Sequence, residues 1–192
     1  MKTGLLFGSF NPVHTGHLII AEHFLNEGIA EEIWLVVSPH NPFKDVQTLA
    51  PVTDRLAMAR LAVEANPRIQ VCDIELSLPT PSYTANTLRN LFASFPDRTF
   101  TLIIGEDNLA GMHNWHDSAW LLSHIELAVF PRTDSMARDS SREIPHTVTR
   151  APLIGISSTA IRALLQQGKS AKYLVPEGVE NYILKHQLYS LK

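Results

Sequence analysis

The sequence predicts an α/β protein: a Rossmann-like, doubly wound parallel sheet with helices on both faces, in a single domain. Three observations lead to this fold class. Short apolar runs that end at glycine, serine or proline alternate along the chain with segments of helical periodicity. This alternation is typical of parallel sheets that are covered on both faces. The chain has 192 residues, which is the length of one ordinary domain, and no repeat or linker divides it.

Each apolar run is short enough to form a strand buried on both faces. The predicted strands cover residues 5–7, 33–37, 69–74, 100–104, 127–130 and 153–156. Helices are predicted where apolar residues recur at helical spacing. They cover residues 17–25, 56–63, 84–95, 158–167 and 176–186, with short helices around 109 and 120–123. The polar stretch 132–150 is interpreted as an exposed loop. The whole chain, 1–192, is expected to form one domain with a C-terminal helical part at about 157–192.

Composition excludes several classes of function. Apolar residues make up 45% of the chain and charged residues 18%, a balance typical of globular proteins. The formal net charge is −3 and there is no basic run, so binding to nucleic acid is not expected. No run reaches the ~18 apolar residues of a membrane span. Cys72 is the single cysteine and 5–7 is too short for a signal-peptide core, which favours a cytoplasmic protein. The sequence leaves a homo-oligomer open.

The loop after the first predicted strand, from Gly8 to His17, is the most informative stretch. Its glycines allow the backbone to approach a ligand closely, and its N–H groups can face an anion. His17 lies at the start of the next predicted helix, where the helix dipole favours phosphate, and His14 precedes it by three residues. Two imidazoles placed there could stabilise charge on a phosphate. A zinc site would need more ligands, and the G-x-G-x-x-G dinucleotide pattern is absent, so no protein-bound metal is predicted.

A second anion-binding signal follows the last predicted strand, in Ile156-Ser157-Ser158-Thr159-Ala160-Ile161-Arg162. Ser157 or Ser158 can cap the following helix. Arg162 lies one turn further on, on the same side as Ser158. A hydroxyl, helix N–H groups and a guanidinium therefore converge on one place. A capped surface helix with a solvated arginine is the simpler interpretation. The presence of the loop from Gly8 to His17, called the histidine loop below, disfavours it.

These motifs resemble those of the H-x-G-H nucleotidyltransferase superfamily, with His14-Thr15-Gly16-His17 as the signature and Ile156 to Arg162 as its I-S-S-T-x-I-R motif. Further segments resemble the bacterial nicotinate-nucleotide adenylyltransferase family. They are the opening Gly8 to His17, Pro42-Phe43-Lys44, Arg55-Leu56, Pro81-Ser82-Tyr83-Thr84, Gly105-Glu106-Asp107 and Trp115-His116. The resemblance covers Gly4 to Tyr189. The chain departs from the family pattern at Phe43, Asn86, Glu106 and Ser118, which concerns acceptor contacts more than the reaction class.

The resemblance implies roles at the matching positions. His14, His17 and Arg162 would be catalytic and would surround the ATP phosphates. The remaining ATP-binding residues would be Gly8, Ser9, Phe10, Gly105, Asp107, Ile156, Ser157 and Ser158, with Asp107 at the ribose and Ile156 against the adenine. The acceptor would be bound by Lys44, Thr84, Trp115 and His116.

The implied reaction is adenylyl transfer from ATP to nicotinate mononucleotide by direct attack of the acceptor phosphate, giving nicotinate adenine dinucleotide and pyrophosphate. Mg²⁺ is expected as a cofactor, bound mainly through the ATP phosphates because no carboxylate cluster is evident. One alternative is another enzyme of the superfamily, which adenylylates phosphopantetheine or transfers a cytidylyl group to an alcohol phosphate. A second is a non-catalytic nucleotide-binding regulator.

Overall fold

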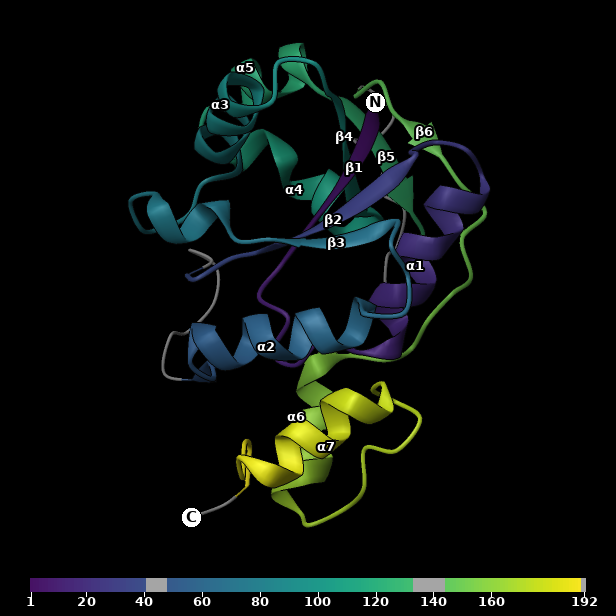
Figure 1. Cartoon of the computed structure of the whole chain (residues 1–192). Coiled ribbons are helices and arrows are strands. Elements are labelled where there is room, and N and C mark those ends of the chain that lie inside the picture. The colour runs from purple at the N-terminus through teal and green to yellow at the C-terminus, as the bar shows by residue number, and fades with distance from the viewer. Residues whose placement is uncertain (41–47, 133–143, 191–192) are drawn as a thin grey trace.

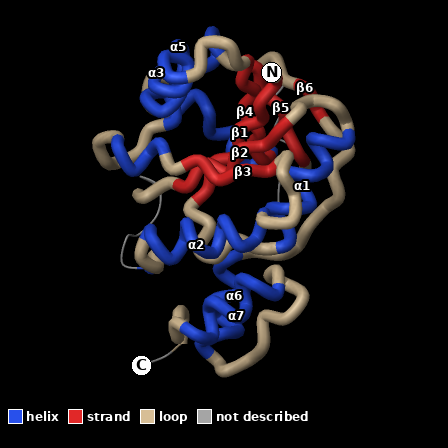
Figure 2. Tube along the Cα trace, in the orientation of Figure 1, coloured by secondary structure: helices blue, strands red, loops and turns tan. Residues whose placement is uncertain are grey.

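The computed structural model describes residues 1–40, 48–132 and 144–190, and its centre is a parallel six-stranded sheet (Figures 1 and 2). The strand order is β3-β2-β1-β4-β5-β6. The strands are β1 (Lys2–Gly8), β2 (Glu32–Val37), β3 (Ile69–Cys72), β4 (Thr99–Gly105), β5 (Glu126–Phe130) and β6 (Thr147–Val148). The order reverses between β1 and β4, which pair with each other through Leu5 and Leu102. In doubly wound sheets, ligands bind at the carboxyl ends of the strands beside this reversal.

Helices cover both faces of the sheet, as the fold class predicts. They are α1 (Thr15–Asn26), α2 (Val52–Val63), α3 (Thr84–Ser94), α4 (Glu106–Gly111), α5 (Ser118–His124), α6 (Ser158–Gln166) and α7 (Glu177–Lys185), with the 3₁₀ turns η2 (Ile74–Ser77) and η3 (Met112–Asn114). Alternation along β2 divides the core. Leu35 packs with α1 and α2 on one face, whereas Trp34 and Val36 pack with α3 and α5 on the other.

The two C-terminal helices lie beyond α2 in Figure 1, on the side of α2 away from the sheet. The hydroxyl of Tyr182 on α7 donates to Asp54 on α2 at 2.9 Å. Ile161, Val179 and Ile183 add buried side chains to the core on the α1 and α2 face. Both helices fall within the predicted C-terminal helical part.

The predicted strand 153–156 is wrong. The sixth strand is instead β6, within the predicted loop 132–150, and it pairs with β5 through Ala128 and Val129. Pro152 has no N–H to donate to a ladder, and Leu153 is 63% exposed. Ile154 and Ile156 are partly buried against the core without belonging to the sheet. An apolar run in extended coil has the same sequence pattern as a short strand.

The predicted strand 69–74 is also too long, because the chain turns into η2 after Cys72.

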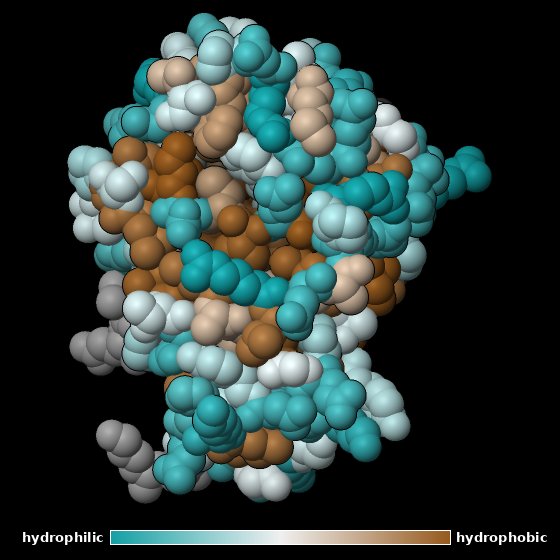
Figure 3. Space-filling model, in the orientation of Figure 1, coloured by the Kyte–Doolittle hydropathy of each residue, from teal (hydrophilic) through white to brown (hydrophobic). Residues whose placement is uncertain are grey.

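Figure 3 shows apolar side chains gathered across the middle of one face of the molecule, with hydrophilic side chains above and below. None of the helices in the described part of the chain has the length and apolar character that crossing a bilayer requires.

Candidate active site

Two cavities meet at the carboxyl end of β1. The first, of about 440 Å³, lies between the start of α1 and the start of α6. The second, of about 680 Å³, extends from the end of β1 toward α3 and η3. His17, Ser158 and Arg132 line both cavities. A ligand in the first cavity and a ligand in the second would therefore come closest to each other beside His17.

The loop that joins β1 to α1 depends on two of its glycines. A Cβ at Gly8 would lie 3.0–3.1 Å from the ring of Phe10, which turns back over it with a φ of 45°. A Cβ at Gly16 would lie 3.0 Å from Nδ1 of His14 and 3.0 Å from Ile154. Both distances are tighter than ordinary van der Waals contact. The glycine between the two histidines therefore lets their rings approach each other and the segment that precedes α6.

The rings of His14 and His17 stack with a centroid separation of 3.6 Å. The backbone N–H of His14 donates to Nδ1 of His17 at 3.1 Å, and Phe10 packs edge-on against His17. His14 is buried, and its Nδ1 has no hydrogen-bond partner among the described residues. Burial, together with the nearby positive charge of Arg132, lowers the pKa of His14 to about 4. At neutral pH His14 is therefore an uncharged imidazole beside the cavity.

Helix α6 brings hydroxyls and a guanidinium to the same cavity. The Ser157 side chain caps the helix by accepting from the N–H of Ala160 at 3.2 Å. The Ser158 hydroxyl donates to the carbonyl of Pro12 at 2.9 Å, and Arg162 donates to the carbonyl of Asn11 at 2.9 Å. These two bonds fasten α6 to the histidine loop. Ile156 is half-buried and lines the same cavity.

The second cavity gathers the residues that the resemblance assigns to the acceptor. Thr84 opens α3, and Trp115 and His116 follow η3. The rings of Tyr83 and His116 lie 4.4 Å apart. Glu75 on η2 also lines this cavity; one of its oxygens accepts from Thr87 at 2.7 Å, and the other is buried without a hydrogen-bond partner among the described residues. Sequence reasoning missed Glu75, because nothing in its local pattern indicates that it is buried.

Gly105 and Asp107 lie at the end of β4 and line the second cavity rather than the first. A Cβ at Gly105 would overlap the Asp107 carboxylate. That carboxylate forms an ion pair with Nε of Arg132 at 3.5 Å, and both side chains are well exposed. Arg132 extends along both cavities, so it connects Asp107 with the residues of the first cavity.

The structure brings together every site residue predicted from the sequence except Lys44, which lies outside the described residues. Besides Glu75, it adds two residues to which the sequence analysis gave no role, Asn11 and Arg55. The Asn11 side chain donates to the carbonyl of Thr48 at 2.9 Å and accepts from the N–H of Ala50 and the hydroxyl of Tyr189. Arg55 lies beneath the same loop. Both residues lie in segments that resemble the family, but their contacts are with partners far away in the sequence, so the motifs do not indicate these roles.

Among the described residues, no group of three or more histidine, cysteine, aspartate or glutamate side chains is arranged to hold a metal ion. The polar side chains around the first cavity carry hydroxyls, imidazoles, guanidinium groups and the Asn11 carboxamide. Such a set suits a phosphate-bearing ligand better than a bare divalent cation, which prefers several carboxylate or carbonyl oxygens.

Comparison with known proteins agrees with this geometry. The cytidylyltransferase-like family model matches residues 5–164. A protein of Cytophaga hutchinsonii named probable nicotinate-nucleotide adenylyltransferase is 46% identical over 190 residues, which is 99% of this chain and 99% of the relative. A protein of the same name from Flavobacterium psychrophilum is 41% identical, over 98% of this chain and 99% of the relative.

The fold is also found in solved structures. The nicotinic acid mononucleotide adenylyltransferase of Plasmodium falciparum, in complex with NaAD, superposes with a TM-score of 0.84 at 20% identity. The match covers 98% of this chain and 97% of that one. The same protein in complex with APC gives a TM-score of 0.82. At this level of identity the likeness concerns the fold.

Proposed function

The chain belongs to the nicotinate-nucleotide adenylyltransferase family of cytidylyltransferase-like proteins, and we propose that its two joined cavities carry out the adenylyl transfer of that family. It is a nucleotidyltransferase. The adenylyl group of ATP passes to the 5′-phosphate of nicotinate mononucleotide, giving nicotinate adenine dinucleotide and pyrophosphate in NAD biosynthesis. The observation that carries the proposal is that His17, Ser158 and Arg132 line both cavities, so that donor and acceptor phosphates can meet there.

The first cavity would hold ATP. Its triphosphate would lie among His14, His17, Ser158 and Arg162, which lie between the N-terminal ends of α1 and α6. Ile156 would contact the adenine, and Gly105 and Asp107 would reach the ribose from the second cavity. The N–H groups of Gly8, Ser9 and Phe10 would face the phosphates that meet at the junction.

The chemical step is a direct substitution at the α-phosphorus. An oxygen of the acceptor's 5′-phosphate forms a bond to that phosphorus while the bond to the pyrophosphate oxygen breaks, and the electron pair leaves with pyrophosphate. No protein nucleophile takes part. His17 and Arg162 stabilise the negative charge that builds on the phosphoryl oxygens. Alignment of the two ligands provides the rest of the rate enhancement. Triphosphate binding brings negative charge near His14, which opposes the effect of Arg132 on its pKa.

Mg²⁺ supports this reaction by neutralising the leaving pyrophosphate. The described residues offer it no carboxylate cluster, so the ATP phosphates and water would supply most of its ligands. Lys44, in the segment after β2, is proposed to bind the acceptor phosphate. The small-molecule substrates and the single cysteine fit a cytoplasmic location.

The second cavity would hold the pyridine ring of the acceptor, with Thr84 at one edge and Trp115 and His116 as flat partners for stacking. The first N–H groups of α3 have no side-chain cap from Tyr83 and would donate to a carboxylate. The Glu75 oxygen that lacks a hydrogen-bond partner among the described residues would favour the amide instead, because it would accept from an amide NH₂ and repel a carboxylate. We expect the helix donors to dominate and the acid to be preferred by ~10²-fold, since a mismatched amide leaves buried donors unpaired.

Pyrophosphate release from ATP with a panel of acceptors tests the proposal. The panel contains nicotinate mononucleotide, its amide, phosphopantetheine and an alcohol phosphate, with CTP in place of ATP as a second arm. We expect the highest kcat/KM with ATP and nicotinate mononucleotide. A higher value for phosphopantetheine, or for CTP with the alcohol phosphate, would identify another enzyme of the superfamily. Nucleotide binding without turnover would identify a regulator, and a preference for the amide would assign ring recognition to Glu75.

A further inference from the structure

One charged side chain beneath the active-site loop has no role in the reaction described above. Arg55 on α2 is 1% exposed. Its guanidinium donates to four backbone carbonyls, which belong to Ser9 at 2.6 Å, Ser38 at 2.7 Å, Pro39 at 3.0 Å and Ala50 at 3.0 Å. These carbonyls come from the end of β1, the end of β2 and the approach to α2. One side chain therefore fastens together three segments at the carboxyl edge of the sheet.

Among the described residues, no carboxylate neutralises the positive charge of Arg55. None of the ion pairs in the described part of the chain includes it. Burial lowers the pKa of Arg55, yet a guanidinium keeps its proton in proteins. Four carbonyl dipoles replace the water that the charge has lost. A buried arginine without a counter-ion is costly in a purely structural role, where a carboxylate partner would be expected.

The direction of these carbonyls determines the direction of the next N–H groups. In a trans peptide unit the C=O and N–H point to opposite sides. With the Ser9 carbonyl held by Arg55, the N–H of Phe10 points away from Arg55. With the Pro39 carbonyl held in the same way, the N–H of His40 also points away. Ser9, Phe10 and Ser38 all line the second cavity, where it approaches the junction at His17.

We propose that Arg55 is a positioning residue for phosphoryl transfer: it holds the ends of β1 and β2 by their carbonyls, aims the loop N–H groups at the reacting phosphates, and places a buried positive charge beneath them. The inference rests on the proposed function and extends it to a residue that does not touch the substrates. Positioning of this kind affects the transition state more than ground-state binding, so kcat should fall more than the affinity for either substrate.

Arg55→Met and Arg55→Lys test the proposal. Methionine keeps an unbranched chain but removes the charge and all donors, whereas lysine restores the charge with fewer donors. We expect Arg55→Met to lower kcat by ~10²-fold with KM values changed less than threefold. Arg55→Lys should recover about a tenth of the wild-type kcat. Arg98→Met is the matched control, because Arg98 is also largely buried but lies away from both cavities.

The measurements are steady-state kinetics on the folded fraction, defined for each variant by circular dichroism and thermal unfolding. A folded Arg55→Met with wild-type kcat would overturn the proposal, as would Arg55→Lys no better than Arg55→Met, or an equal loss of kcat in Arg98→Met. If Arg55→Met does not fold, Arg55→Lys decides, and wild-type kcat in that variant overturns the proposal. Wild-type protein inactive with nicotinate mononucleotide would instead contradict the proposed function.

Discussion

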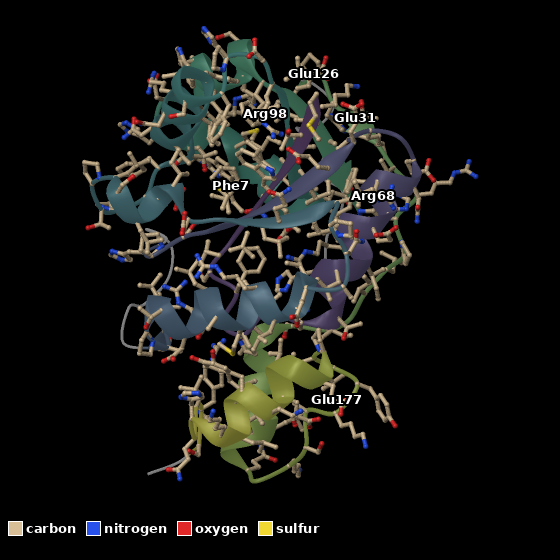
Figure 4. All side chains as sticks on the ribbon, viewed as in Figure 1. Phe7, Glu31, Arg68, Arg98, Glu126 and Glu177 are labelled. Carbon is tan, nitrogen blue, oxygen red and sulfur yellow. The ribbon has the colours of Figure 1, made fainter. Side chains whose placement is uncertain are left out.

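The two ends of the parallel sheet each hold a largely buried arginine, and the two arginines differ in the kind of partner that they bind. Where the strands begin, Arg98 forms an ion pair with Glu32, donates to Thr3 at 2.9 Å and lies over the ring of Trp34. Figure 4 places Arg98 and Glu126 at this end. Where the strands end, the Arg55 guanidinium donates to four backbone carbonyls and forms no ion pair within the described residues.

This difference separates stability from function within one sheet. A neutralised charge at the beginning of the strands adds little to the field around the molecule. The charge of Arg55, which the described carboxylates do not neutralise, contributes to the positive potential at the ends of the strands, where Arg162 lines the first cavity. Changes at the carboxyl edge should therefore affect turnover, and changes at the opposite edge should affect only the free energy of unfolding.

The largest effect is expected for His17→Ala, at the junction of the two cavities. Its donor acts on charge that develops in the transition state, so kcat should fall by 10²- to 10³-fold while ATP affinity changes little. Steady-state kinetics together with equilibrium binding of ATP measures both quantities. Near-normal turnover in a folded variant would remove His17 from the mechanism.

The next effect concerns stability at the carboxyl edge and its dependence on pH. The pKa of His14 is lowered to about 4, so the unfolded chain takes up a proton at a higher pH than the folded one. Stability from this group is complete above pH ~6.5 and is lost as pH falls toward 4, by about 3 kcal/mol in total. Urea unfolding of wild type and His14→Asn between pH 7 and 4 measures the difference. Parallel curves for the two proteins would show that His14 is protonated equally in both states.

The smallest effect is expected at the beginning of the strands. Glu32→Gln leaves Arg98 without its carboxylate, and we expect a loss of about 2 kcal/mol in unfolding free energy. This is less than for a fully buried pair, because the Arg98 side chain is 24% exposed. The kcat and both KM values should stay within twofold of wild type when measured well below the melting temperature. A tenfold change in kcat would contradict the inference that the beginning of the strands contributes to stability and not to turnover.

The sequence predicts the parts of this protein that depend on local pattern. The positions of the first five strands, the capped start of α6 and the placement of His14 and His17 at the start of α1 all follow from short-range spacing, whereas the stacking of the two rings was not predicted. The strand expected at 153–156 failed because buried coil and a short strand share one apolar pattern. Arg55 and Asn11 lie in segments that resemble the family, but their contacts could not be predicted, since most of their partners are backbone atoms of distant segments and any residue type can supply a carbonyl.

The fastening of the histidine loop has a consequence for how the chain acquires its site. Ser158 reaches Pro12 across 146 positions, Arg162 reaches Asn11 across 151, and Tyr189 reaches Asn11 across 178. Each of these contacts closes a loop of more than 140 residues, and the sheet reduces that entropy cost by bringing the two segments together. We therefore expect the loop after β1 to become ordered late in folding, when α6 and the C-terminal segment dock onto it.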